Sequence, residues 1–368
     1  MNRTSFGWTG ALLVLIAILC GGVVSVSTAA AQEKALRIDR IPDKRGELFY
    51  NIVVKPWAEK NGVKITLGTF NSDEQMLANV RSAPGSYDLA YMGGTSIFRG
   101  SKLNLLETIR TENVPNYTKF VDPKYQRQKT DPGPGVHQLA DAPGTFLIVY
   151  AKDKFPTSPP ETYELFHDPK YKGKFALRDY AVYEVLMNLA YLGHDLETLS
   201  SLTKDEEERL FKTMKNQRNL VRTYWKSAAE NRTLLANREI IASDYWISPT
   251  LDQKSSLNLG WYIPKEGSPM WMQSWVIAKG SKHRDLAEQL LNHYYDPAVF
   301  MAYKRALGSD VVILRDDAYD HSAFEKEFPD LAQIGAALRA RGKDLNPSLI
   351  EANETKWIER FEEIKLGN

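Results

Sequence analysis

From residue 35 onward, the apolar positions switch between the period of a strand and that of a helix. Residues 35–39, 63–67 and 87–92 alternate or run apolar over the length of a strand. Residues 46–61 and 71–83 instead carry apolar side chains at helical spacing. We therefore expect the order β-α-β-α-β, which predicts a parallel sheet with helices on both faces.

Residues that bend, stop or start helices support these boundaries. Pro56 lies inside the first predicted helix and should kink or divide it, because proline cannot donate a backbone hydrogen bond. Gly62 should end that helix. Ser72 or Asp73 can accept hydrogen bonds from the free N–H groups at the start of the next helix.

A tight turn after the third strand is the first candidate for a binding site. Gly93, Gly94, Thr95 and Ser96 follow that strand and precede another predicted helix. Ligands of open α/β sheets bind outside the carboxyl ends of the strands. The first turn of a helix also offers unpaired backbone N–H groups to polar or anionic ligands. We therefore expect this turn to contact a ligand.

The rest of the chain predicts a second α/β segment at about 152–265 and a helical, polar-faced tail at 323–365. Residues 112–144 contain five prolines and are expected to form loops. The further elements that the pattern predicts are strands at 145–150, 239–243 and 271–278 and helices at 180–192, 204–217 and 283–295.

The first 31 residues have the form of a secretory signal peptide. Arg3 precedes the apolar run 11–26, and Ala29-Ala30-Ala31 is an A-x-A cleavage site. A membrane anchor and a lipoprotein modified at Cys20 are the alternatives. Cleavage after Ala31 is favoured, because small residues follow the apolar run and bulky Leu19 precedes the cysteine. The mature chain would then contain no cysteine and would depend on core packing alone.

Composition narrows the class of protein. The chain has 368 residues, 43% hydrophobic, which is enough for a large core and one or two domains. Its 47 basic and 46 acidic residues nearly cancel, so the protein has no strong net electrostatic field. This balance argues against a nucleic-acid binder. Eight tryptophans and 18 tyrosines could supply flat faces for a ligand.

Four stretches together resemble the periplasmic solute-binding proteins of ABC importers, in the spermidine/putrescine branch. They are residues 72–77 with 87–89, 160–165 with 168–174, 264–267 with 271–274, and 286–291 with 296–297. The resemblance implies an α/β, two-lobed periplasmic-binding-protein fold of type II, with hinge strands between the lobes. It also implies a small-molecule ligand, an inner-membrane ABC permease as partner and a periplasmic location. We expect a monomer without cofactor, bound metal, nucleic acid or enzymatic activity.

The resemblance also suggests boundaries. Lobe 1 would comprise residues 32–147 and 276–325, and lobe 2 residues 148–275. Residues 326–368 would form a helical tail on lobe 1. The chain is expected to cross between the lobes near 147–150 and again near 274–277.

The resemblance implies a cleft in which aromatic faces cover the ligand and carboxylates pair with its ammonium groups. Trp271 is retained, but Gln273 stands where the branch has an aspartate, and Tyr180 and Tyr183 stand where it has carboxylates. This pattern suits a ligand less cationic than spermidine: a monoamine, a zwitterion or an organic acid. The candidate ligand-binding residues are Gly94, Thr95, Ser96, Asp179, Tyr180, Tyr183, Asp244, Tyr245, Trp271 and Gln273.

Seven of these ten candidates also have a purely structural interpretation. Trp271 could pack in the hinge, and Gln273 could bond within its strand. Tyr180 and Tyr183, three residues apart, could face a core. Asp244, Thr95 and Ser96 could serve as turn or cap residues.

Two other functions use motifs present in the chain. A ferric-ion transporter on the same scaffold would use adjacent tyrosines such as Tyr294 and Tyr295, although the six histidines show no metal-ligand spacing. An exported hydrolase could use the S-x-x-K match that begins at Ser201 and ends at Lys204. Lys204 opens a charged helix, which favours a surface helix cap for this segment.

Overall fold

The computed structural model describes residues 34–308 and 311–367. The predicted signal peptide and Cys20 lie outside the described residues. Among the helices that are described, none combines the length and apolarity needed to cross a membrane.

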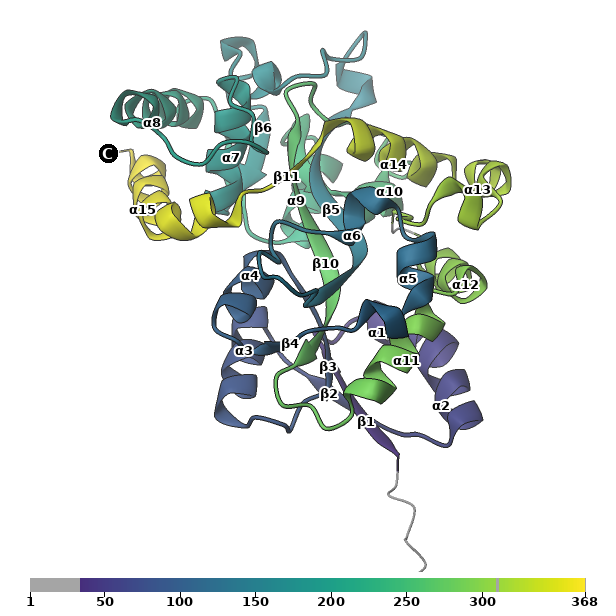
Figure 1. The fold of residues 1–368 in the computed structure, drawn as a ribbon. Coiled ribbons are helices and arrows are strands. Elements are labelled where there is room, and N and C mark those ends of the chain that lie inside the picture. Colours follow the sequence, from purple (N-terminus) through teal and green to yellow (C-terminus); the bar gives the residue numbers. More distant parts are fainter. Residues whose placement is uncertain (1–33, 309–310, 368) are drawn as a thin grey trace, which may run out of the picture. The chain divides into compact units, whose positions relative to one another are not determined.

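A mixed sheet organises the described chain (Figure 1). Its main path runs β2-β1-β3-β10-β5-β8-β6-β7, while β4 and β11 pair with β10, and β9 pairs with β5. β1, β2 and β3 are parallel as predicted, and so are β6, β7 and β8. The strands are β1 Ala35–Arg40, β2 Lys64–Thr69, β3 Leu89–Gly93, β4 Leu106–Glu107, β5 Gln138–Ala151, β6 Phe175–Arg178, β7 Thr223–Trp225, β8 Ala242–Trp246, β9 Leu259–Tyr262, β10 Ser268–Ala278 and β11 Gly342–Asp344.

The antiparallel strands β5 and β10 join the two parallel groups. β5 pairs with β10 up to Thr145, with β8 from Phe146 onward and with β9 from Ile148 onward. β10 in turn pairs with β3 over residues 273–277. The chain therefore passes from one parallel group to the other inside these two long strands.

The segment 112–144 was expected to form loops, but it contains two short helices, Pro115–Phe120 and Pro123–Gln126, and β5 begins inside it at Gln138. The prediction is wrong for these parts. Pro143 lies within the strand, opposite Met272. Gln273 pairs with Ala142 and Ser274 with Ala140, so Asp141 is the extra residue of a β-bulge. Its buried carboxylate accepts hydrogen bonds from Lys304 Nζ at 3.0 Å and Tyr91 Oη at 2.6 Å. These long-range contacts stabilise the bulge. The number of prolines in the segment, on which the loop prediction was based, carries no information about such contacts.

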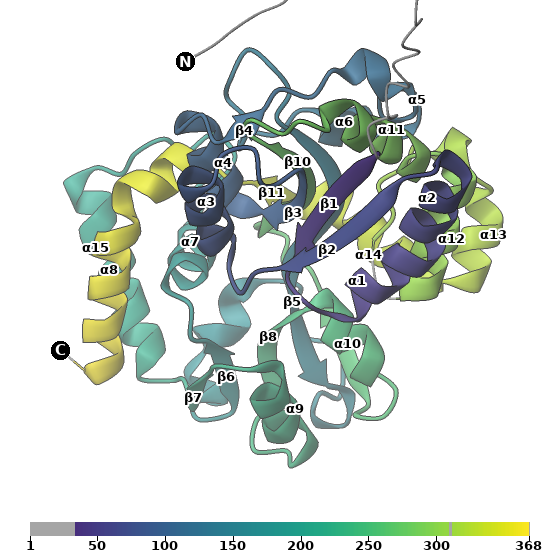
Figure 2. The same ribbon diagram turned by 90° about the horizontal axis from the view of Figure 1, so that it is seen from below.

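Helices cover the faces of the sheet (Figures 1 and 2). Their bounds are α1 Lys44–Phe49, α2 Lys55–Asn61, α3 Asp73–Ser82, α4 Gly94–Lys102, α5 Pro115–Phe120, α6 Pro123–Gln126, α7 Ala181–Tyr191, α8 Lys204–Arg218, α9 Ala228–Ala236, α10 Ile247–Gln253, α11 Arg284–Tyr294, α12 Pro297–Leu307, α13 His321–Glu327, α14 Pro329–Arg341 and α15 Pro347–Leu366. A π-helix, Tyr50–Val54, divides α1 from α2 just before Pro56. Gly62 ends α2 with φ 62°, and the Ser72 side chain caps α3 by accepting from Gln75 N. These helix signals are confirmed.

β8 starts at Ala242, later than the predicted strand 239–243. Arg238 adopts a φ of 56°, which belongs to a turn rather than a strand. The backbone N–H of Glu239 still bonds to the Leu234 carbonyl at the end of α9. The pattern therefore found the strand but misplaced its pairing by a few residues.

The C-terminal tail was expected to lie on lobe 1, but its last helix, α15, packs mainly on the segment predicted as lobe 2. Leu349, Ile350, Trp357, Phe361 and Ile364 of α15 share one hydrophobic cluster with buried residues of α7 and α8, within 148–275. Figure 2 shows α15 beside α8. α15 also reaches α4, through ion pairs of Glu351 with Lys102 and Glu354 with Arg99. A polar-faced helical pattern predicts a helix but does not say which surface its apolar face will find.

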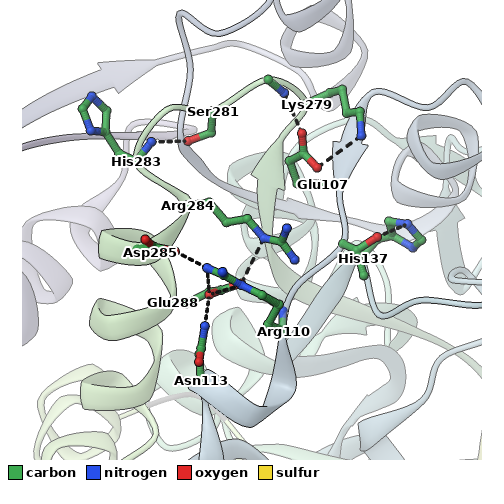
Figure 3. Close-up of polar contacts among 12 residues, drawn as sticks. Glu107, Arg110, Asn113, His137, Lys279, Ser281, His283, Arg284, Asp285 and Glu288 are labelled. Atoms are coloured by element: carbon green, nitrogen blue, oxygen red, sulfur yellow. Dashed lines mark hydrogen bonds and ion pairs between the residues drawn. The ribbon is translucent and has the colours of Figure 1, made fainter.

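A network of charged groups attaches α11 to the segment after β4 (Figure 3). The carboxylate of Glu288 is fully buried. It accepts hydrogen bonds from Arg110 Nε at 2.9 Å, Asn113 Nδ2 at 2.7 Å and Arg284 Nε at 3.1 Å. Burial opposes ionisation of Glu288, but these bonds outweigh it and lower the pKa.

Candidate functional site

The carboxyl ends of four parallel strands converge on one region. Arg40, Gly93, Arg178 and Trp246 are the last residues of β1, β3, β6 and β8. All four line one or both of two adjoining cavities, where ligands of α/β sheets are expected.

The larger cavity has a volume of about 730 Å³ and the smaller one about 380 Å³. Both are lined by Asp73, Trp246, Trp271 and Gln273, so they meet at these side chains. Their volumes lie in the range of small-molecule sites. Residues from both parallel groups of strands and from β5 and β10 form the walls.

Aromatic rings form the apolar wall. Trp271 lies 5.4 Å from Tyr183 and 5.8 Å from Phe146, measured between ring centroids. Phe146 in turn stacks on Trp246 at 5.9 Å. Such contacts hold the rings in fixed orientations and leave their faces for an apolar or cationic part of a ligand.

The space beside Trp271 and Gln273 depends on two glycines. A Cβ atom at Gly144 would lie 2.3 Å from Trp271 Cε2, and one at Gly93 would lie 2.7 Å from Gln273 Nε2. Real Cβ atoms do not approach other atoms so closely. Gly93 and Gly144 therefore permit the observed positions of both candidate ligand-binding side chains.

Two carboxylates from the start of α3 lie at the site. Burial raises the pKa of Asp73 to about 6, with Glu74 adding to the rise and a 3.0 Å hydrogen bond from Gly93 N opposing it. Burial also disfavours the Glu74 carboxylate, but bonds including the one from Ser96 Oγ at 2.8 Å hold its pKa below the usual value. Both groups suit a ligand ammonium, which would gain an anionic partner.

Arg40 brings the opposite charge to the larger cavity. Its guanidinium lies over the Tyr91 ring, 4.8 Å from the centroid, and Nη2 is 3.3 Å from Asp43 Oδ1. Arg40 lines the larger cavity only, whereas Glu74 and Asp344 line the smaller one only. Asp43 and Arg45 also line only the larger cavity, and Arg178 only the smaller one. The charges that belong to one cavity alone therefore balance to positive in the larger cavity and to negative in the smaller one.

The structure brings most of the predicted site residues together. Those that line the cavities are Gly94, Thr95, Ser96, Tyr180, Tyr183, Trp271 and Gln273. Gly94, Thr95 and Ser96 form the first turn of α4 directly after β3. Ser96 is buried, and its hydroxyl is used by Glu74.

Asp179, Asp244 and Tyr245 line neither cavity, and the expectation for them is corrected. Tyr245 is fully buried and donates to the Ala228 carbonyl at 2.8 Å, because successive side chains of β8 point to opposite faces and Trp246 takes the cavity side. Asp244 is buried beneath Trp225, whose Nε1 donates to it at 3.0 Å. Asp179 forms ion pairs with Lys226 and Lys365.

Sequence reasoning missed Arg40, Asp73 and Trp246 as site residues. Asp73 was interpreted only as a possible helix cap, and Ser72 takes that role. Trp246 stands next to the predicted Tyr245, so the strand-end signal was correct within one position. Arg40 ends β1 after a buried strand, and a charged residue at that position was the available signal.

The residues behind the two other functions have structural roles. Tyr294 and Tyr295 are fully buried and bond to Asp141 and to the Ala140 carbonyl. No group of three metal-ligating His, Cys, Asp or Glu residues occurs in residues 34–308 and 311–367. Thr203 caps α8 in a capping box with Glu206, and Lys204 is a surface residue, as the helix-cap interpretation predicts.

Comparison with known proteins places this geometry in a family. The profile of the bacterial extracellular solute-binding protein family matches residues 53–332. The chain belongs to this family. Accordingly it is a transport protein that binds a solute, and the expected resemblance is confirmed.

Curated relatives and solved structures agree with this family. The spermidine/putrescine-binding periplasmic protein of Escherichia coli K12 is 22% identical, over 79% of this chain and 82% of the relative. The putrescine-binding periplasmic protein PotF of the same organism is 24% identical, over 75% and 77%. The crystal structure of PotD from Streptococcus pneumoniae has a TM-score of 0.76 at 19% identity, covering 91% of this chain and 99% of that one. This likeness confirms the two-lobed α/β fold of the solute-binding protein.

Proposed function

We propose that this solute-binding protein is the substrate-binding component of an ABC importer and carries a small organic amine or zwitterion. The observation that carries this proposal is the pair of cavities at the strand ends, with aromatic rings and carboxylates on their walls. Aromatic faces favour the carbon chain of an amine, and Asp73 and Glu74 favour its ammonium group.

The names of the relatives support an amine as ligand, because they bind spermidine or putrescine. The protein would act in the periplasm after removal of residues 1–31, as a monomer that presents its loaded form to a permease. The boundaries of the two lobes, near 147 and 276, belong to this proposal. The proposal also includes the assignment of the cavity-lining candidates as ligand contacts: Gly94, Thr95, Ser96, Tyr180, Tyr183, Trp271 and Gln273.

The test begins with protein purified from its native host. Mass spectrometry of the extract should identify a small molecule that is lost when the protein is unfolded and refolded. Re-adding that molecule should raise the melting temperature by mass action, without any chemical turnover. If nothing co-purifies and no amine or amino acid raises the melting temperature, the proposed function is overturned.

A further inference from the structure

We propose that Arg40 binds a carboxylate of the transported solute, so that the solute is a zwitterion and not a diamine or polyamine. This inference rests on the function proposed above and names the class of ligand for the same site.

The first observation is the state of the Arg40 guanidinium. Arg40 is 8% exposed, and within the described ranges its buried Nε and Nη1 atoms have no hydrogen-bond partner. A guanidinium remains protonated in proteins, so it cannot relieve the cost of burial by losing its charge. Buried donors without partners are costly. Because Nε and Nη1 are closed to solvent, the guanidinium must turn toward the cavity before the two oxygens of an anionic ligand can satisfy them.

The second observation is how the side chain is held. The aliphatic part of Arg40 lies against Gly46, where a Cβ atom would be 3.1 Å from Arg40 Cδ. The Tyr91 ring supports the guanidinium and lines the same cavity. Tyr91 is itself positioned by its hydrogen bond to the buried Asp141. These contacts keep the charged group at the cavity wall, so only the guanidinium itself has to turn to bind an anion, which limits the ordering cost.

Asp43 is the protein's own carboxylate at Arg40. It is reached only by Nη2, at 3.3 Å, and its side chain is 41% exposed. At this distance, and with the Asp43 carboxylate open to solvent, the ion pair is weakened by screening, so a ligand carboxylate can compete with it or bind beside it.

The charges elsewhere in the site define the orientation of the solute. Asp73 lies where the cavities meet, and Glu74 and Asp344 line the smaller one. Arg178 is committed to the wall, because it stacks on Trp225 and Trp246 and donates to the Trp225 carbonyl. The ammonium end of a zwitterion therefore fits near Asp73 and Glu74. A diamine long enough to span both cavities would place its second ammonium beside Arg40, where like charges repel.

The test uses refolded, ligand-free protein and two matched sets of probes in titration calorimetry and thermal-shift assays. One set contains 4-aminobutanoate, 5-aminopentanoate, lysine and arginine; the other contains putrescine, cadaverine and spermidine. The inference expects binding from the amino-acid set and at least tenfold weaker binding from the diamine set. Arg40→Gln should weaken the amino-acid binding by about 10- to 100-fold. Arg40→Lys, which keeps the charge without the bidentate geometry, should give an intermediate loss.

Arg305→Gln is the matched control, because Arg305 lies on α12 in a surface ion pair with Glu327 and should leave affinity unchanged. The melting temperature of the free Arg40→Gln protein should be unchanged or higher, because an unsatisfied buried charge is removed. If only the diamines bind, or if Arg40→Gln binds amino acids as well as the parent protein, solute binding stands and the carboxylate site is overturned. If neither set binds and the native extract contains no solute, the proposed function fails as well.

Discussion

The indole of Trp271 lies directly above Gly144, so close that a Cβ atom at residue 144 would be 2.3 Å from Trp271 Cε2. The two residues pair across β5 and β10, the strands that join both halves of the sheet. The ring that lines both cavities is therefore positioned by the absence of a side chain on the neighbouring strand.

Gly144→Ala should displace Trp271 and weaken solute binding by about tenfold, because a rigid ring cannot yield as a flexible side chain does. Titration calorimetry with the solute that binds the parent protein measures this loss. Gly335→Ala is the control: it lies in α14, where the added Cβ meets only Val311 at 3.4 Å, and should leave affinity unchanged. Unchanged affinity in Gly144→Ala would mean that Trp271 does not contact the solute.

Trp246→Ala and Tyr245→Phe distinguish the cavity face of β8 from its opposite face. Trp246→Ala should lower affinity by about 1–3 kcal/mol, because it removes a ring from the cavity wall. Tyr245→Phe should leave affinity unchanged and cost about 1 kcal/mol of folding stability, through loss of its bond to Ala228. Parallel calorimetric titrations and urea unfolding curves check both. A loss of affinity in Tyr245→Phe together with unchanged affinity in Trp246→Ala would contradict the assignment of Trp246 to the cavity face of β8.

Asp73 should make solute binding depend on pH. Its pKa of about 6 in the folded protein lies above the usual value near 3.9. Protonation of Asp73 therefore stabilises the ligand-free folded protein relative to the unfolded chain. That stabilising contribution is fully present below about pH 4 and is lost as the pH rises through about 6. Affinity for an ammonium-bearing solute should move the other way and fall as the pH drops below about 6. Calorimetry between pH 5 and 7.5 tests this, and Asp73→Asn should remove the dependence. An identical pH profile in that variant would exclude Asp73 as its origin.

Glu288 should contribute to stability in acid. Its pKa is lowered in the folded protein, so its contribution is present above the unfolded value near 4.3 and is lost as the pH falls through the lower folded value. Glu288→Gln should be less stable than the parent protein at pH 7, with a smaller difference near pH 3. Urea unfolding at both pH values measures the change. A difference that is independent of pH would show that packing, and not charge, gives Glu288 its role.

Trp357 anchors α15 in the cluster that it shares with α7 and α8. Trp357→Ala should cost about 3–5 kcal/mol, because it leaves a large cavity beneath the helix. The neighbouring Ile358 is 45% exposed, and Ile358→Ala should change stability by less than about 0.5 kcal/mol. Urea unfolding compares the two variants. Equal small effects would mean that α15 is not part of the cooperative core.

The local pattern predicted α1 to α4, α7, α8 and α11 and the strands β1, β2, β3, β5, β8 and β10, but it did not predict α5, α6, α9, α10 and α12 or the remaining short strands. Helix ends such as Ser72 and Gly62 depend on hydrogen bonds and dihedral angles within a few residues, so neighbouring letters predict them. The same reasoning located the turn after β3 and the aromatic strand of Trp271. The motif order also identified the family that comparison confirmed.

The sequence predicted only some of the residues that line the site. Whether Tyr245 or Trp246 faces the cavity depends on the register of β8 against β5, and a shift of one position exchanges the faces. The bulge at Asp141 likewise depends on Lys304, and the position of α15 depends on the bond between its Lys365 and Asp179. Each of these pairs is separated by more than 150 residues in the sequence. Arg40 became a candidate only when Gly46, Tyr91 and the cavity were seen around it. Local order follows from neighbouring residues, but burial, facing and charge pairing arise from contacts between distant segments, which only the folded chain brings together.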